Sequence, residues 1–158
     1  MQRQDAVVTY LLKDNQVLMV YGHKPYAPHY TKWNGAGGKV TEGDTSLEAA
    51  AIRETEEETG YTPANLELKA KILFTGKTPD KEFLVSYYIG RDFTGELKSE
   101  DEPDAKAEWC EIKDGLPTLE ILEGDKELFD RIVTGEYFEG HAEYDGDRWV
   151  GFTDGLMV

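Results

Sequence analysis

The stretch "GGKVTEGDTSLEAAAIRETEEETGY", residues 37–61, places a pair of glycines directly before the most strongly patterned helix of the chain. Its second half is rich in Ala and Glu, Thr45 to Glu48 has the spacing of a capping box, and Gly60 is a helix stop signal. The stretch therefore predicts a helix from about Ser46 to Thr59 that follows a glycine-rich loop.

Acidic side chains crowd one face of this helix. Residues three and four apart share a face, so Glu54, Glu57 and Glu58 project together, and Arg53 lies one turn before Glu57. Like charges at these spacings repel by roughly 0.2–0.5 kcal/mol per pair. A hard divalent cation such as Mg²⁺, which binds carboxylate oxygens and phosphates, would relieve that repulsion. The pattern predicts a metal and phosphate site, and the alternative is a solvated face of an ordinary surface helix.

The rest of the chain predicts strands, a second helix and turns. Apolar runs separated by turn residues predict an N-terminal hairpin and a C-terminal hairpin, and a glycine-rich loop holds one short strand. The expected strands are Ala6–Leu12, Val17–Tyr21, Lys32–Asn34, Ala70–Phe74, Phe83–Ile89, Ala107–Ile112, Tyr137–Tyr144 and Arg148–Phe152, and the second helix is Leu116–Val133, interrupted near Gly124. Helices among hairpin-connected strands predict an α/β sandwich with a mixed sheet.

The length and the net charge of the chain limit the kinds of function that it can have. The 158 residues are the size of one domain, residues 1–158, and 32 Asp and Glu against 17 Lys and Arg leave a net charge of −15. This charge disfavours polymeric nucleic acid as a partner and favours a small metal-complexed ligand. The single Cys110 cannot form an intramolecular disulfide, and the apolar run from Ala6 to Leu12 is too short to span a membrane. We therefore expect a cytoplasmic protein without a membrane partner.

Residues 38–61 resemble the Nudix box, whose pattern is G-x5-E-x7-R-E-U-x-E-E-x-G-U with U a bulky apolar residue. The second half agrees at Arg53, Glu54, Glu57, Glu58, Gly60 and Tyr61, with Thr55 at the usual apolar place. In the first half Asp44 replaces Glu, and eight residues rather than seven separate it from Arg53. We expect this insertion to lengthen the loop or the first helical turn and to leave the glutamates in place.

The resemblance implies a Nudix α/β/α sandwich that hydrolyses a nucleoside diphosphate linked to another moiety. It implies that the Gly38 carbonyl and the carboxylates of Glu54, Glu57 and Glu58 bind Mg²⁺, or Mn²⁺ in its place, and that Arg53 orients them. Glu54 or Glu58 would accept the proton of the attacking water, with Glu57 as the bridging ligand. A further metal-binding carboxylate is expected in the acidic segment before Trp109, with Glu102 first and Asp104 second.

The stretch "KWNGAGGKV", residues 32–40, is similar to MutT-type 8-oxo-dGTP diphosphatases within the Nudix family. This similarity implies that Asn34 binds the purine edge, that Thr9 and Phe74 line the base pocket, and that Asp125 reads the base. Lys39, beside the glycines, would neutralise phosphate. A turn-capping role for Asn34, core packing for Phe74 and a solvated Lys39 remain as alternatives.

The expected activity is hydrolysis of a purine nucleoside triphosphate such as 8-oxo-dGTP to the monophosphate and pyrophosphate. The alternatives are another nucleotide derivative, such as ADP-ribose, a dinucleoside polyphosphate, a nucleotide sugar or an RNA 5′ end, and a non-catalytic nucleotide-binding module. Intact glutamates in the box favour an enzyme over a binding module. The oligomeric state is left open by the sequence.

Overall fold

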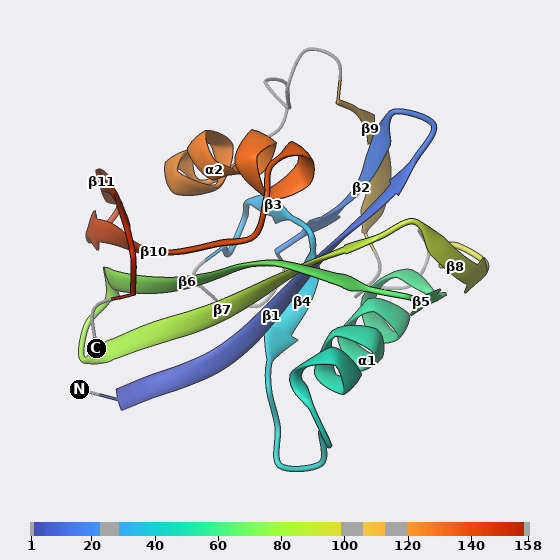
Figure 1. Ribbon diagram of the computed structural model, residues 1–158, viewed down its shortest axis with the longest axis horizontal. Helices are drawn as coiled ribbons and strands as arrows, with labels where there is room; N and C mark the ends of the chain where they lie inside the picture. The colour runs from blue at the N-terminus through green and yellow to red at the C-terminus, as the bar shows by residue number, and fades with distance from the viewer. Residues whose placement is uncertain (1, 23–28, 99–105, 113–119, 157–158) are drawn as a thin grey trace.

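The computed structural model describes residues 2–22, 29–98, 106–112 and 120–156. Within these residues a nine-stranded sheet has the order β11-β10-β6-β7-β1-β2-β3, with β4 and β9 attached to its β1 and β2 strands. A separate two-stranded sheet pairs β5 (Tyr61–Ala64) with β8 (Asp92–Gly95). Figure 1 shows one helix on each side of the large sheet.

Strand β1 (Gln2–Lys13) forms the centre of the sheet. It pairs antiparallel with β2 (Gln16–Tyr21) and β4 (Ala36–Lys39), and parallel with β7 (Lys81–Gly90). Residues 7–12 form an unbroken buried apolar run with one Thr. Such a run is typical of a strand that is covered on both faces, which is where β1 lies.

The remaining strands extend the sheet on both sides of β1. On the β2 side lie β3 (Trp33–Asn34) and β9 (Ala107–Glu111), both antiparallel to β2. On the β7 side, β6 (Glu67–Thr78) is antiparallel to β7, β10 (Phe138–Asp145) is parallel to β6, and β11 (Arg148–Asp154) forms a hairpin with β10. Parallel and antiparallel pairs together make the sheet mixed, as predicted.

The two helices cover opposite faces of the sheet because neighbouring residues of β1 point to opposite sides. Val7 packs with Ala50 and Ala51 of α1 (Leu47–Thr59). Val8 belongs instead to the large core cluster that contains Leu128 and Ile132 of α2 (Glu123–Thr134). The arrangement confirms the α/β/α sandwich (Figure 1).

Three local expectations need correction. The N-cap of α1 is Ser46, whose Oγ accepts a hydrogen bond from the Ala49 amide at 3.0 Å, so the capping box placed at Thr45 is wrong by one residue. Residues 36–38, expected as loop, belong to strand β4 (Ala36–Lys39), because pairing with β1 overrides the weak strand preference of Gly. The second helix begins at Glu123, and residues 113–119 lie outside the described part of the chain.

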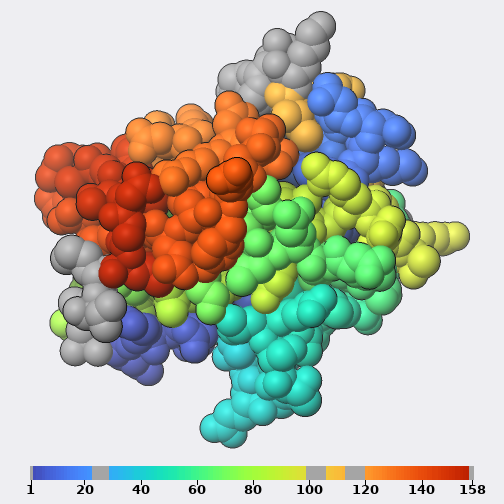
Figure 2. All heavy atoms as spheres, viewed as in Figure 1, coloured from blue at the N-terminus to red at the C-terminus, as the bar shows by residue number. Residues whose placement is uncertain are grey.

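The loop before α1 projects from the body of the molecule. Figure 2 shows this loop and α1 as a protrusion at the lower edge of the view. Glu42 and Gly43 in the loop are exposed. Among the described residues, no helix is both long and apolar enough to cross a membrane.

Candidate active site

A cavity of about 320 Å³ lies over one face of the sheet. Its floor consists of side chains that alternate along the strands and therefore point to the same side, as period-two alternation requires. These are Ala6 and Val8 of β1, Phe74 of β6, Phe83, Val85 and Tyr87 of β7, and Tyr144 of β10. The floor is thus aromatic and aliphatic, which suits the face of a planar ring.

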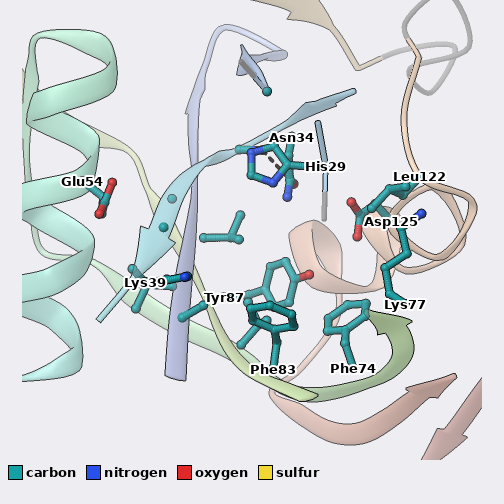
Figure 3. Close-up of a pocket in the computed structure, with 18 of the residues that line it drawn as sticks. His29, Asn34, Lys39, Glu54, Phe74, Lys77, Phe83, Tyr87, Leu122 and Asp125 are labelled. Atoms are coloured by element: carbon teal, nitrogen blue, oxygen red, sulfur yellow. Dashed lines mark hydrogen bonds between the residues drawn. The ribbon is translucent and has the colours of Figure 1, made fainter. Parts of the chain in front are cut away.

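Polar groups gather at two ends of this cavity. Glu54 and Glu58 of α1 contribute to one end, beside the backbone of β4. Asp125 of α2 and Lys77 of β6 contribute to the other. Figure 3 shows Glu54 and Asp125 on opposite sides of the view, with Asn34 between them. The cavity therefore connects an acidic site on one helix with a polar site on the other.

The backbone of β4 positions both glutamates of α1. Glu54 is buried, with 5% of its surface exposed, and a Cβ atom at Gly38 would lie only 2.7 Å from its Oε1. Glycine at this position lets the carboxylate lie against the strand. The Gly37 amide donates a hydrogen bond of 2.6 Å to Glu58 Oε1. Both carboxylates are thereby fixed relative to the sheet.

Arg53 connects three acidic residues around this end of the cavity. Its Nη1 donates to Glu54 Oε1 at 2.9 Å and lies 3.3 Å from Glu57 Oε2. Its Nε and Nη2 donate to the two oxygens of Asp44 at 2.7 and 2.9 Å. Hydrogen bonding between Arg53 and Asp44 raises the pKa of Arg53 and lowers the pKa of Asp44. Asp44 thus anchors the arginine that holds Glu54.

The inserted residue of the box does not disrupt the contacts that Arg53 makes with Asp44 and Glu54. The helix starts at Leu47, and Asp44 lies in the loop before it, where its carboxylate still reaches Arg53. The Asp44 carboxylate also accepts a hydrogen bond of 2.8 Å from the Thr41 amide, which closes the loop on itself. The expectation that the insertion lengthens the loop or the first helical turn stays a prediction, and the contacts of Arg53 with Asp44 and Glu54 are formed in its presence.

Replacing Asp44 with Ala is expected to lower the melting temperature and to reduce kcat about tenfold, because Arg53 loses the bidentate partner that orients it toward Glu54. A lowered carboxyl pKa stabilises the folded state above the unfolded pKa and loses that effect as the pH falls through the folded value. The difference in melting temperature between wild type and variant should therefore be present at pH 7 and shrink below about pH 4. Glu42→Ala, an exposed change in the same loop, is the control. Equal melting curves for Asp44→Ala and wild type at pH 7 would contradict the anchoring role.

The donor set at this end fits a hard divalent cation. Mg²⁺ takes carboxylate and carbonyl oxygens and completes its shell with water and substrate phosphate, so one or two protein carboxylates suffice. Glu54, Glu58 and the adjacent backbone at Gly38 offer such oxygens on the cavity wall. Residues that hold a metal are thus available from α1 and β4.

The structure brings two of the three predicted carboxylates to the cavity. The described residues contain no group of three or more His, Cys, Asp or Glu side chains arranged to hold a metal. Glu57 does not line the cavity, and its side chain is 58% exposed beside Arg53. The helical turn of about 100° per residue separates its direction from that of Glu58, and Arg53 holds it on the outer side.

Asn34 occupies the middle of the cavity wall with a fixed orientation. Its Oδ1 accepts hydrogen bonds from the Gly35 amide at 2.8 Å and from the Tyr10 hydroxyl at 3.3 Å. The side-chain oxygen of Asn34 is therefore already used in hydrogen bonds within the protein, and the side-chain amide nitrogen is the group directed into the cavity (Figure 3). A hydrogen-bond donor is presented there to a ligand.

Asp125 is the polar group at the far end of the cavity. Burial raises its pKa to about 7, and the charge of Lys77 acts in the opposite direction. The pKa values of Tyr10, Tyr87 and Tyr144 are raised by burial first and by Asp125 second. Asp125 therefore lies within electrostatic reach of tyrosines from three strands, in a region with little water.

Comparison with known proteins gives the family. The NUDIX domain family matches residues 2–132. The chain belongs to the Nudix family, and it is a Nudix hydrolase. It is 34% identical over 119 residues to an oxidized purine nucleoside triphosphate hydrolase of Danio rerio, covering 73% of this chain and 71% of that protein.

Two further relatives agree with this assignment. The mouse (Mus musculus) protein of the same name is 28% identical over 113 residues, which are 72% of this chain and 70% of that protein. A crystal structure of a MutT protein from Bacillus halodurans superimposes with a TM-score of 0.78 at 25% identity, covering 95% of this chain and 96% of that one. The Nudix fold therefore spans nearly the whole chain.

The cavity of this Nudix hydrolase includes most residues predicted from the sequence. Those on its wall are Asn34, Gly38, Lys39, Glu54, Glu58, Phe74 and Asp125. Thr9 is buried in β1 and does not line the cavity, whereas its neighbours Val7 and Val8 do. Val8 takes the place expected for Thr9. Glu102 and Asp104 lie outside the described residues.

Several lining residues were not predicted. Phe83, Val85 and Tyr87 share a face of β7. Their alternating spacing in the sequence indicates that they lie on one face, but not that this face lines the cavity. Lys77 lies within an irregularity in the pairing of β6 with β7, between Phe74 and Thr78, which sequence periodicity does not reveal. His29 lines the cavity from the loop before β3, where no periodic pattern exists.

Proposed function

We propose that this Nudix hydrolase is a divalent-metal-dependent pyrophosphohydrolase that cleaves an oxidised purine nucleoside triphosphate, with 8-oxo-dGTP as the leading substrate, to the monophosphate and pyrophosphate. The observation that carries the proposal is one cavity with carboxylates Glu54 and Glu58 at one end, Asp125 at the other and Asn34 between them. A nucleotide has matching parts, because its phosphates need a metal site and its base needs hydrogen-bonding partners.

The size and lining of the cavity support a purine at the Asp125 end. A volume of about 320 Å³ is within the usual range for small-molecule sites. Phe74, Phe83 and Tyr87 provide ring contacts, while the Asn34 amide and the Asp125 carboxyl provide edge contacts. The names of the zebrafish and mouse relatives, both oxidized purine nucleoside triphosphate hydrolases, point to the same substrate class.

The acidic end would carry the reaction. Glu54 and Glu58, with the Gly38 backbone, would hold the metal, and Glu57, which shares Arg53 Nη1 with Glu54, would be a third carboxylate on the outer side of the helix. A bound Mg²⁺ supplies charge neutralisation for the phosphates and favours in-line attack by water. Arg53 fixes Glu54 as a ligand, and Glu58, held by the Gly37 amide, is assigned as acceptor of the water's proton. Lys39, on the same wall, would contact a phosphate oxygen.

The test is hydrolysis of a nucleotide panel with and without Mg²⁺, reported as kcat/KM for each compound. The panel contains 8-oxo-dGTP, dGTP, ADP-ribose, a dinucleoside tetraphosphate and GDP-mannose. We expect 8-oxo-dGTP to be preferred, with monophosphate and pyrophosphate as products, and EDTA to abolish turnover. Preference for ADP-ribose or GDP-mannose would overturn the substrate assignment, and no turnover of any compound would overturn the catalytic assignment in favour of a binding module.

A further inference from the structure

Tyr10 is a buried residue of β1 that lies behind the cavity wall. It is 1% exposed and does not line the cavity. Its hydroxyl donates a hydrogen bond to Asn34 Oδ1 at 3.3 Å, and Asn34 does line the cavity. A tyrosine hydroxyl that is buried needs such a partner. The contact connects the core of the sheet to a polar group of the wall, so Tyr10 can act on a ligand through Asn34 without touching the ligand.

The ring of Tyr10 is held by aromatic side chains on two sides. It lies against Tyr87 of β7, with ring centroids 6.2 Å apart and 19° between the planes. It meets Phe129 of α2 edge to face, at 5.1 Å and 85°. Tyr87 itself lines the cavity. The hydroxyl of Tyr10 is therefore fixed relative to the cavity floor, and burial, which raises its pKa, keeps it protonated as a donor.

Glycine after Asn34 allows the chain to pack against this ring. A Cβ atom on Gly35 would lie 2.9 Å from Cδ1 of Tyr10 and 2.6 Å from the carbonyl oxygen of Thr9. Neither approach leaves room for a side chain at residue 35. The segment that carries Asn34 therefore comes this close to β1 because its next residue is glycine, and the close approach brings Asn34 Oδ1 within reach of the Tyr10 hydroxyl.

Two donors meet at the Asn34 oxygen, and they have different effects. The Gly35 amide at 2.8 Å and the Tyr10 hydroxyl at 3.3 Å together use both acceptor positions of this oxygen. The Gly35 amide belongs to the next residue, so it sets which end of the carboxamide carries the oxygen but moves with the backbone of β3. Tyr10 belongs to β1, which β2 separates from β3 in the sheet, and Val8 of β1 lines the cavity. The Tyr10 hydroxyl therefore fixes the carboxamide relative to a strand of the cavity floor.

We propose that Tyr10 is a positioning residue for ligand binding: by donating to Asn34 Oδ1, its hydroxyl holds the Asn34 carboxamide so that the amide nitrogen stays at one place in the cavity. The inference rests on the proposed function, since it takes the ligand to be a purine nucleotide with a hydrogen-bond acceptor facing that nitrogen. Figure 3 shows Asn34 between Glu54 and Asp125, so the fixed donor lies between the two ends of the cavity. A donor that is already ordered spares the ligand the cost of ordering it.

Removing the hydroxyl should weaken ligand binding without changing the chemical step. In Tyr10→Phe the ring remains, but the ligand must order the Asn34 side chain when it binds, which costs about two- to tenfold in affinity. We expect the dissociation constant of 8-oxo-dGMP and the KM for 8-oxo-dGTP to rise about fivefold. We expect kcat to change by less than about twofold, because a loss of binding that the ground state and the transition state share raises KM alone.

The experiment is a double-mutant cycle of Tyr10→Phe and Asn34→Ala, with 8-oxo-dGMP binding measured by calorimetry. If Tyr10 acts through Asn34, Tyr10→Phe weakens binding about fivefold when Asn34 is present and by less than about 1.5-fold in Asn34→Ala. Tyr88→Phe is the matched control, because Tyr88 is also a buried tyrosine of the sheet, packs with α1 and does not line the cavity. We expect this control to bind 8-oxo-dGMP like the wild type, and melting curves of all variants verify that each is folded.

The side-chain amide signals of Asn34 in ¹H–¹⁵N NMR spectra of the free protein give a second readout that needs no ligand. We expect Tyr10→Phe to shift these signals, because the hydrogen bond to the carboxamide oxygen is lost. Tyr88→Phe should leave them in place. This measurement tests the contact between Tyr10 and Asn34 separately from any effect on binding.

Two kinds of result would overturn the role of Tyr10 even if 8-oxo-dGTP is hydrolysed as proposed. One is an equal loss of affinity from Tyr10→Phe with and without Asn34, since Tyr10 would then act by another route. The other is a wild-type affinity for 8-oxo-dGMP, or unchanged Asn34 amide signals, in Tyr10→Phe. A wild type that neither binds 8-oxo-dGMP nor hydrolyses any nucleotide of the panel would overturn the proposed function, and the positioning role would fail with it.

Discussion

Replacing Glu58 with Gln is expected to lower kcat by about 10² to 10⁴ while leaving the fold intact, because general-base assistance of this size is lost with the carboxylate. The amide oxygen of Gln can still accept the hydrogen bond that the Gly37 amide donates to Glu58 Oε1 at 2.6 Å. The variant therefore removes the basic group, together with the negative charge that Glu58 would offer to a metal, and keeps the side-chain position. Single-turnover and steady-state rates with 8-oxo-dGTP and Mg²⁺ measure the effect.

Glu56→Gln provides the matched control for this measurement. Glu56 lies two residues earlier on α1, is exposed, and does not line the cavity. It removes the same charge from the same helix, so kcat close to that of the wild type is expected. Equal losses in the two variants would indicate a general effect of helix charge, and near-normal turnover in Glu58→Gln would move the proton-accepting role to Glu54.

Replacing Gly38 with Ala is the second change with a large expected effect. The added Cβ would lie 2.7 Å from the Glu54 carboxylate, closer than atoms pack, so the carboxylate must move. Because the obstacle is the end of a side chain, the fold should tolerate the change. Displacement of a catalytic group by about 1 Å can cost about 10² in rate. We expect kcat/KM to fall by about this factor with little change in melting temperature.

Gly43→Ala is the control for Gly38→Ala within the same box. A Cβ at Gly43 meets no atom within 4 Å, so only the general effect of adding a methyl group to a loop glycine remains. Both variants are compared by kcat/KM and by the dependence of rate on Mg²⁺ concentration. A normal rate and normal Mg²⁺ dependence in Gly38→Ala would show that the close approach of Glu54 to β4 has no part in catalysis.

The features that were predictable from the sequence are those set by local spacing. The helix that carries Glu54 and Glu58 follows from its composition, from the stop signal at Gly60 and from the fixed spacing of the box. The two hairpins follow from apolar runs joined by turn residues. In each case the interacting residues are neighbours along the chain, so one short window contains the information.

The features that escaped prediction depend on contacts between distant residues. Thr9 was expected in the cavity, but the phase of β1 is set by its partners β4 and β7, and it brings Val8 there instead. Strand β4 consists of residues with little strand preference and exists because β1 pairs with it. The direction of Lys77 depends on a hydrogen bond between Gly146 and Gly76, seventy positions apart in the chain.

The pairing of β4 with β1 has a consequence for the length of the ligand. Gly37 pairs with Val8, and Gly38 pairs with Val7, so the strand that supports the carboxylates is bonded directly to the strand that floors the cavity. Residues in paired strands are held at fixed separations by the ladder of hydrogen bonds. The distance between the acidic end and the ring-binding floor is therefore fixed by the pairing of the two strands. A ligand that reaches both ends must match that interval. The cavity therefore selects ligands by the distance between their ring and their phosphates, whatever hydrogen-bonding groups the ring carries.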